Sequence, residues 1–134
     1  MNEKLNNLVE VFKNLDTNDL YEFLMELGSQ GSFPPELMKP RHFVDGCQSQ
    51  VWVVGFEEDE GVKYFGTSDS FIVRGIVYIV CDVVSELSPE EISKINYEYF
   101  EPFGKFFTHQ RRRGMQAIIN KIKQINTAHQ RIEK

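Results

Sequence analysis

The sequence predicts an α+β fold in which a small antiparallel sheet of three strands packs against several helices. Three observations predict it. Apolar residues recur at helical spacing near both ends of the chain, and two short β-forming runs flank an acidic turn at residues 57–61. A longer apolar run begins after residues that commonly cap helices. With 134 residues, 41% of them hydrophobic and 26% charged, the chain fits a single domain spanning residues 1–134.

Two helices are expected at the start of the chain. The first carries an apolar stripe formed by Leu5, Leu8, Val9, Phe12 and Leu15. Asp16 is a suitable N-cap for the second helix, and Gly28 is expected to end it. Residues 29–40 contain three of the five prolines and are therefore expected to form a surface loop.

The strands are expected in the middle of the chain. Residues 51–56 are nearly all apolar and β-forming, which predicts a buried strand, and residues 62–65 fit its hairpin partner. Residues 42–44 are expected to supply a third, short strand. These three segments make up the predicted sheet.

Residues 69–87 are rich in Val and Ile, which favours a strand, but their length and the Asp69-Ser70 pair favour a helix. A helix that is apolar almost all round would be the central, buried one. Ser88 and Pro89 then mark a further helix start.

The last third of the chain is expected to hold a connection and a long helix. Residues 97–107 are aromatic and broken by Pro102 and Gly104, so they predict a packed, irregular connection. From about residue 110 to the C-terminus, a last helix carries a stripe of Met115, Ile118, Ile119, Ile122 and Ile125.

Charge and hydropathy exclude several classes of partner. The net charge of −5 argues against nucleic acid, because domains that bind it usually carry a basic excess. The longest apolar run is interrupted by Arg74 and Asp82 and is shorter than the roughly 20 residues that span a bilayer. The first residues lack the apolar core of a secretion signal. A cytoplasmic protein with no membrane partner is expected.

Cys47 precedes the first predicted strand and has three possible roles: packing, metal binding or reaction as a thiol. A structural metal site usually needs four Cys or His ligands, and an iron–sulfur cluster commonly needs four thiolates. The chain has two cysteines and three histidines, with no close ligand pair, so a cluster scaffold is the weakest interpretation. His42 and His109 are available for a Cys–His hydrolase, but no nucleophile motif surrounds Cys47.

The two cysteines have different neighbours. Cys81 lies inside the apolar run at 71–84, where free cysteine is usually a packing residue. Cys47 follows Gly46 and precedes the polar triplet Gln48-Ser49-Gln50, which predicts a loop tip in front of a strand. Functional groups are often presented at such places on a rigid base.

Residues 46–52, GCQSQVW, resemble the motif of the SufE family of sulfur acceptors. The resemblance extends to LMELG at 24–28, SDSFIVRG at 68–75, SPEEI at 88–92 and the Arg-x-x-Gly-hydrophobic pattern at 111–115. It covers nearly the whole chain, in order. The sequence departs from the family at Asp45, where many members have histidine, at His109-Gln110, and at the additional basic residues Arg112 and Arg113.

The resemblance implies a SufE/IscU-like fold and a carrier rather than a stand-alone enzyme. It implies that Cys47 takes sulfur from a PLP-dependent cysteine desulfurase (of the SufS or CsdA type) as a persulfide. The sulfur would pass to an iron–sulfur scaffold complex, and the carrier would also stimulate the desulfurase. No cofactor is implied on this chain.

Four neighbours of Cys47 are expected to support its loop: Asp45, Gly46, Gln48 and Ser49. Gly46 would either act as a hinge that turns the thiol inward or outward, or be an ordinary turn glycine.

Arg111 matches the family's arginine and lies four positions before Met115, on the apolar side of the last helix. It is expected near the Cys47 loop or at the partner interface. The alternative function is a docking subunit that activates the desulfurase and in which Cys47 is dispensable.

Overall fold

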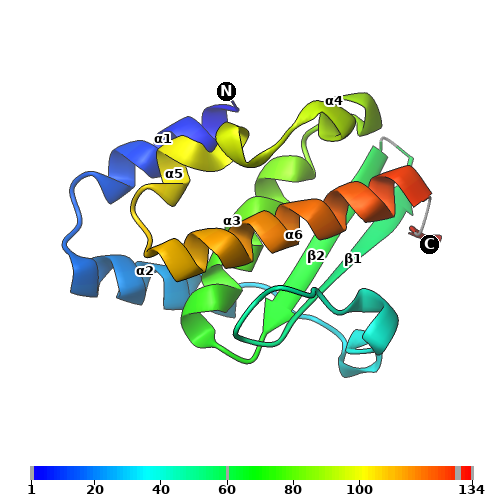
Figure 1. Cartoon of the computed structure of the whole chain (residues 1–134), viewed down its shortest axis with the longest axis horizontal. Helices are drawn as coiled ribbons and strands as arrows, with labels where there is room; N and C mark the ends of the chain where they lie inside the picture. The colour runs from blue at the N-terminus through cyan, green and yellow to red at the C-terminus, as the bar shows by residue number, and fades with distance from the viewer. Residues whose placement is uncertain (1, 60, 129–130, 134) are drawn as a thin grey trace.

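The computed structural model of the chain describes residues 2–59, 61–128 and 131–133 (Figure 1). Its helices are α1 (Glu3–Phe12), α2 (Thr17–Ser29), α3 (Phe71–Val84), α4 (Pro89–Lys94), α5 (Glu101–Gly104) and α6 (His109–Ala128). Its strands are β1 (Val51–Glu58), β2 (Gly61–Ser68) and β3 (Ile132–Glu133). Single 3₁₀ turns are η1 (Pro35–Leu37), η2 (Pro40–His42) and η3 (Tyr97–Phe100). The α+β class is confirmed.

The antiparallel part of the sheet has two strands, not three. β1 and β2 pair in register from Val51 opposite Ser68 to Glu58 opposite Gly61. The expected third strand at 42–44 is reduced to one bridge between Phe43 and Trp52. The 3₁₀ turn η2 continues to His42, so too few extended residues remain there to form a ladder. The strand that does join β1 on its other side is β3, and it runs parallel.

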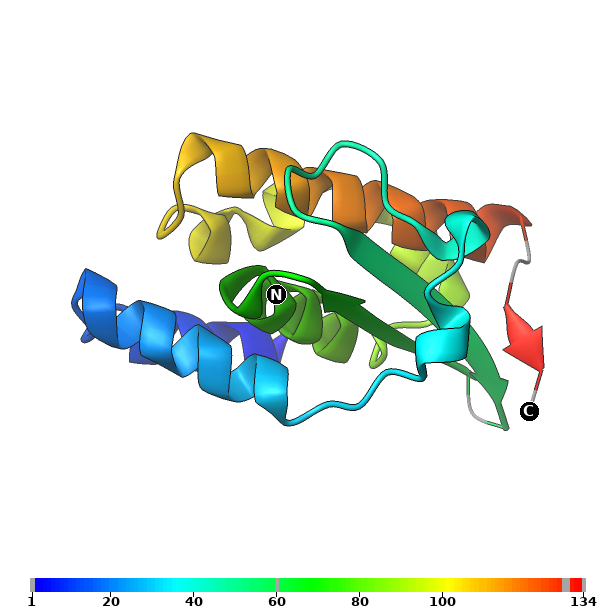
Figure 2. The same cartoon turned by 90° about the horizontal axis from the view of Figure 1, so that it is seen from below.

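α3 is the central helix, as the sequence predicts. Figure 2 shows it between α2 on one side and α6 on the other, with the β1–β2 hairpin packed against it. Its buried side chains include Ile76, Val77, Ile79, Val80, Cys81, Val83 and Val84. Within the described part of the chain, no helix combines the length and the apolar character needed to cross a membrane.

The predicted helix starts are confirmed by their hydrogen bonds. The Asp16 side chain accepts a hydrogen bond from the Asp19 backbone N–H at 2.8 Å, and the Ser70 hydroxyl accepts one from Val73 at 3.3 Å. Ser88 and Glu91 form a capping box at the start of α4. Each cap satisfies N–H groups that have no partner within the helix, and so fixes where the helix begins.

Gly28 does not end α2, although its position in the sequence suggested that it would. The helix continues through Ser29, and Gly28 is buried against α3. A Cβ on Gly28 would lie 2.9 Å from the backbone nitrogen of Gly75, and a Cβ on Gly75 would overlap the carbonyl group of Leu24. The two glycines therefore let the backbones of α2 and α3 approach closely.

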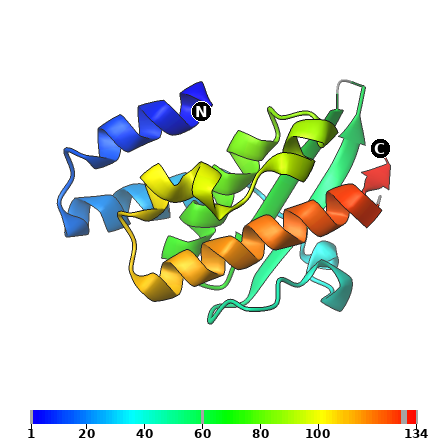
Figure 3. The ribbon, with the colours of Figure 1, turned by 45° about the horizontal axis from the view of Figure 1, so that its top comes forward.

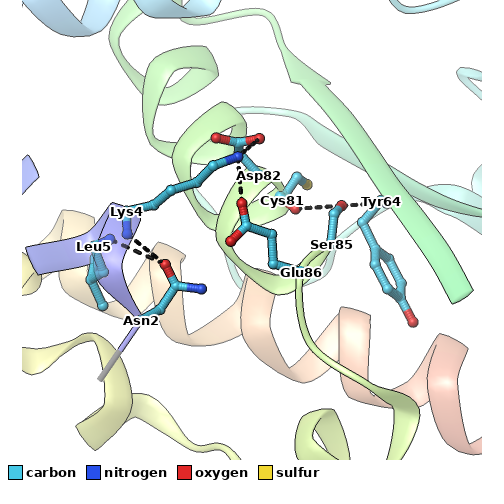
Figure 4. Close-up of polar contacts among 8 residues, drawn as sticks. All are labelled: Asn2, Lys4, Leu5, Tyr64, Cys81, Asp82, Ser85 and Glu86. Carbon is cyan, nitrogen blue, oxygen red and sulfur yellow. Dashed lines mark hydrogen bonds and ion pairs between the residues drawn. The ribbon is translucent and has the colours of Figure 1, made fainter. Parts of the chain in front are cut away.

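The C-terminal turn of α3 holds both α1 and the edge of β2 (Figure 4). The Lys4 ammonium group lies 3.1 Å from Asp82 and 2.7 Å from Glu86, which joins the first turn of α1 to α3. The Ser85 hydroxyl accepts a hydrogen bond from the Tyr64 backbone N–H at 2.9 Å and donates one to the Cys81 carbonyl at 2.7 Å. One helical turn thus anchors two neighbouring elements.

We predict that Gly75→Ala lowers the free energy of unfolding by about 2–3 kcal/mol, because the added methyl group forces α2 away from α3. Urea unfolding followed by circular dichroism measures the loss. Gly31→Ala is the matched control, since its Cβ would meet the Tyr78 ring at an ordinary 3.7 Å. Its effect should stay within about 0.5 kcal/mol. Equal stability of the two variants would show that the helix contact tolerates a methyl group.

Candidate functional site

The segment before β1 forms a loop that lies beside α6 (Figure 3). The Val44 N–H bonds to the Val51 carbonyl at 2.8 Å, so the two ends of the loop are held together. Residues 45–50 therefore project from the base of β1 toward the first turns of α6. Cys47 lies at the middle of this projection.

The Cys47 side chain points inward. Its Sγ donates a hydrogen bond to the Gly114 carbonyl oxygen at 3.4 Å, and the side chain packs against the hydrophobic core while staying partly exposed. A Cβ on Gly114 would lie 3.6 Å from Sγ, so the glycine allows the thiol to rest almost on the helix backbone. Sequence reasoning did not single out Gly114, although it stands within the Arg-x-x-Gly pattern.

A cavity of about 250 Å³ opens beside the thiol. Its floor is apolar and is formed by Val73, Ile76, Met115 and Ile118. Its polar rim is formed by Gln48, Ser49, Ser70, Thr108, Gln110 and Arg111. Of the residues chosen from the sequence, Cys47, Gln48, Ser49 and Arg111 therefore meet around one cavity.

Burial raises the pKa of the Cys47 thiol to about 11. A neutral thiol is a poor nucleophile, and only the thiolate attacks sulfur or carbon efficiently. At pH 7 a thiol with this pKa is ionised in about one molecule in ten thousand. In the inward conformation the thiol is therefore mostly protonated, which lowers its reactivity as a nucleophile.

Asp45 and Gly46 lie on the other side of the loop. Gly46 has φ +100°, a left-handed conformation that non-glycine residues rarely adopt, and a Cβ there would also lie 3.3 Å from the Cβ of Ala117. This conformation accounts for glycine as a turn residue, whereas a hinge role stays a prediction. Asp45 and Gly46 line a second pocket, of about 390 Å³, against α6.

Asp69 ties the end of the loop to the start of α3. Its carboxylate accepts a hydrogen bond from the Gln50 N–H at 3.0 Å, and its own N–H bonds to the Gln50 carbonyl at 3.2 Å. The sequence suggested Asp69 only as a helix cap, shared with Ser70, and the cap is Ser70. A partner nineteen residues away leaves no local signal in the sequence.

Arg111 borders the cavity but is held by α2. Its Nη1 donates a hydrogen bond to the Tyr21 hydroxyl at 2.8 Å, and its guanidinium carbon lies 4.8 Å from the centre of the Tyr21 ring. The arginine therefore links the first turn of α6 to α2, near the thiol but without contacting it. Tyr21 was not expected at the site, because nothing in its own helix distinguishes it from a packing residue.

The arrangement suits chemistry carried by one thiol. In the described residues, no group of three His, Cys, Asp or Glu side chains is placed to hold a metal ion. Cys81, the second thiol, is fully buried in α3, where burial raises its pKa further than that of Cys47. Of the two thiols, Cys47 is therefore the accessible one.

The chain is similar to known proteins along most of its length. A family model described as SufE, an Fe–S metabolism associated domain, matches residues 6–126. A SufE-like protein of Rhizobium meliloti (strain 1021), itself uncharacterised, is 35% identical over 130 residues, which cover 89% of this chain and 91% of that protein.

Two further proteins are similar. One from Plasmodium falciparum (isolate 3D7), named cysteine desulfuration protein SufE, is 35% identical over 130 residues, which cover 90% of this chain and 52% of that longer protein. The solution structure of a hypothetical protein from Thermus thermophilus matches the fold with a TM-score of 0.75 at 20% identity, over 96% of both chains.

We predict that Cys47 ionises with a midpoint near pH 11, well above the 9.0 of an exposed thiol. The measurement is the ultraviolet absorbance of the thiolate, as the difference between wild type and Cys47→Ser. Since the unfolded chain ionises first, the stability that the protonated thiol contributes is complete below pH 9 and is lost as the pH rises toward 11. A native midpoint at or below that of the urea-unfolded chain would contradict the inward placement.

Proposed function

Because the chain belongs to the SufE family, which is associated with iron–sulfur metabolism, we propose that it is a sulfur acceptor whose Cys47 carries a persulfide. The donor is a PLP-dependent cysteine desulfurase, and the carried sulfur serves iron–sulfur cluster assembly in the cytoplasm. The observation that carries the proposal is the placement of Cys47. It is a single accessible thiol on a loop, sheltered beside a cavity that is apolar inside and polar at its rim.

The transfer is a thiol exchange with no net oxidation. The Cys47 thiolate attacks the outer sulfur of the donor persulfide, a new S–S bond forms on Cys47, and the S–S bond on the donor breaks. The donor cysteine leaves as a thiolate and takes up the proton that Cys47 gave up. The acceptor needs no cofactor of its own for this step.

The raised pKa of Cys47 makes the reaction depend on the partner. In the inward conformation the thiol is protonated and lies against the backbone of α6. Turning the loop outward removes the burial that raises the pKa, so the thiolate becomes accessible when the donor is present. The left-handed Gly46 and the Gln50–Asp69 hydrogen bonds are the two points where such a movement would begin and end.

The second candidate is a docking subunit that stimulates the desulfurase without using Cys47. The same raised pKa favours it, because a protonated thiol is a poor sulfur acceptor. The two candidates differ in what Cys47→Ser does. A carrier loses sulfur acceptance with this change, whereas a docking subunit keeps its full stimulating effect.

We predict that incubation with a cysteine desulfurase, PLP and free cysteine adds one sulfur atom to the protein. Mass spectrometry under non-reducing conditions measures the addition. Cys47→Ser should take up none, while Cys81→Ala should still take up one, because Cys81 is buried in α3. Absence of any adduct on wild type would exclude the carrier, and undiminished stimulation by Cys47→Ser would favour the docking subunit.

We further propose that the Arg111 guanidinium contacts the desulfurase at the rim of the Cys47 cavity. Arg111→Ala should weaken desulfurase binding roughly tenfold, as loss of an interfacial charge contact commonly does. Isothermal titration measures the affinity. Tyr21→Phe is the matched control, since it removes the acceptor of the 2.8 Å hydrogen bond and keeps the ring. Equal weakening by both variants would show that Arg111 acts only by holding α6 to α2.

A further inference from the structure

A cluster of cations surrounds the pocket on the Asp45 side of the Cys47 loop. This pocket lies between residues 43–46 and the outer side of α6, and Arg113 and Lys121 line it. Lys121 donates a hydrogen bond from Nζ to the Arg41 carbonyl at 2.8 Å, which brings η2 to the same place. Lys39, like Arg41 and Lys121, lies close enough to buried His42 to lower its pKa. We call this pocket the basic groove, together with the four cations around it: Lys39, Arg41, Arg113 and Lys121.

The basic groove contrasts with the rest of the chain. Four cations and the groove's Asp45 sum to +3, so the net charge of −5 leaves −8 on all other residues. Lys39, Arg41 and Arg113 are exposed, and within the described residues none of the four cations forms an ion pair with a carboxylate. Burial lowers the pKa of His42, and the nearby Arg41, Lys121 and Lys39 lower it further.

The chemistry of the basic groove fits a short acidic segment of a protein. Gln116, Asn120 and Gln124 add amide groups beside the cations, and these can bond to backbone and carboxylate groups alike. A long polyanion such as a nucleic acid would extend onto the acidic remainder of the surface, where it would be repelled. A protein partner can place carboxylates in the groove alone.

The loop separates the basic groove from the cavity of Cys47. Asp45 and Gly46 line the groove, while Cys47 and Gln48 line the cavity on the other side. A carboxylate that enters the groove therefore comes to lie beside Asp45 and repels it. The structure shows the protein with a free, inward thiol, which is the form that a sulfur donor meets first.

We propose that the basic groove docks an acidic segment of the sulfur-donating desulfurase and thereby displaces the Cys47 loop. The proposal rests on the function proposed above. It assigns recognition to one side of the loop and chemistry to the other. Binding in the groove would destabilise the inward position of the thiol through the repulsion of Asp45.

The test uses the double variant Lys39→Glu/Arg113→Glu, whose two side chains are exposed, and the desulfurase that adds sulfur to wild type. The matched control is Lys13→Glu/Lys63→Glu, which changes the net charge equally and lies at the end of α1 and on β2. Stopped-flow association at low ionic strength should be roughly tenfold slower for the groove variant, and this difference should shrink with added salt. The control should associate within about twofold of wild type.

The outcomes separate this proposal from the proposed function. If wild type takes up no sulfur, the carrier function is wrong. If wild type takes up sulfur but the groove and control variants associate alike, only the basic groove proposal is wrong. Normal association of the groove variant with slow passage of its sulfur to a recipient protein would assign the groove to the recipient and overturn the proposal.

Discussion

The close approach of α2 and α3 at Gly28 and Gly75 is the constraint on which the site depends. Since α3 packs against the β1–β2 hairpin on another side, the contact fixes α2 relative to the sheet. It places Tyr21 where the Arg111 guanidinium can reach it, and so positions the first turn of α6. The carbonyl of Gly114, which accepts the Cys47 hydrogen bond, follows in the next turn. The position of the thiol thus depends on two glycines, Gly28 and Gly75, that lie in other helices.

Protection and reactivity of Cys47 depend on the same contact. Packing on α6 raises the pKa of the thiol, and a protonated thiol is oxidised or alkylated more slowly than a thiolate. A thiol that was permanently exposed beside cations would ionise more readily and react faster. It would then react with any electrophile that it met. Backbone hydrogen bonds at Val44 and Gln50 hold the two ends of the loop. They favour the inward position of the thiol and still leave the residues between them free to turn outward.

Local features of the fold were predictable from the sequence, whereas contacts between distant segments were not. Caps such as Asp16 and Ser88, and the stripe of α6, depend on neighbours within one helix and are visible in the pattern. Gly28 was mistaken for a helix end because its reason for being glycine lies on α3. The position of Cys47 on a loop before a strand could be predicted, but its burial, its Gly114 partner and the Tyr21–Arg111 contact could not. Each of these needs the packing of α6 against other elements.

The hydroxyl of Ser85 has a consequence for solubility. β2 is an edge strand of the sheet, and exposed edges invite pairing with strands of other molecules, which leads to aggregation. By accepting the Tyr64 N–H, Ser85 occupies a donor that an incoming strand would use. Lys63 adds a charge on the same strand, close to Phe65, which is 43% exposed. The outer edge of β2 is thereby closed at Tyr64 to pairing with a strand of another copy.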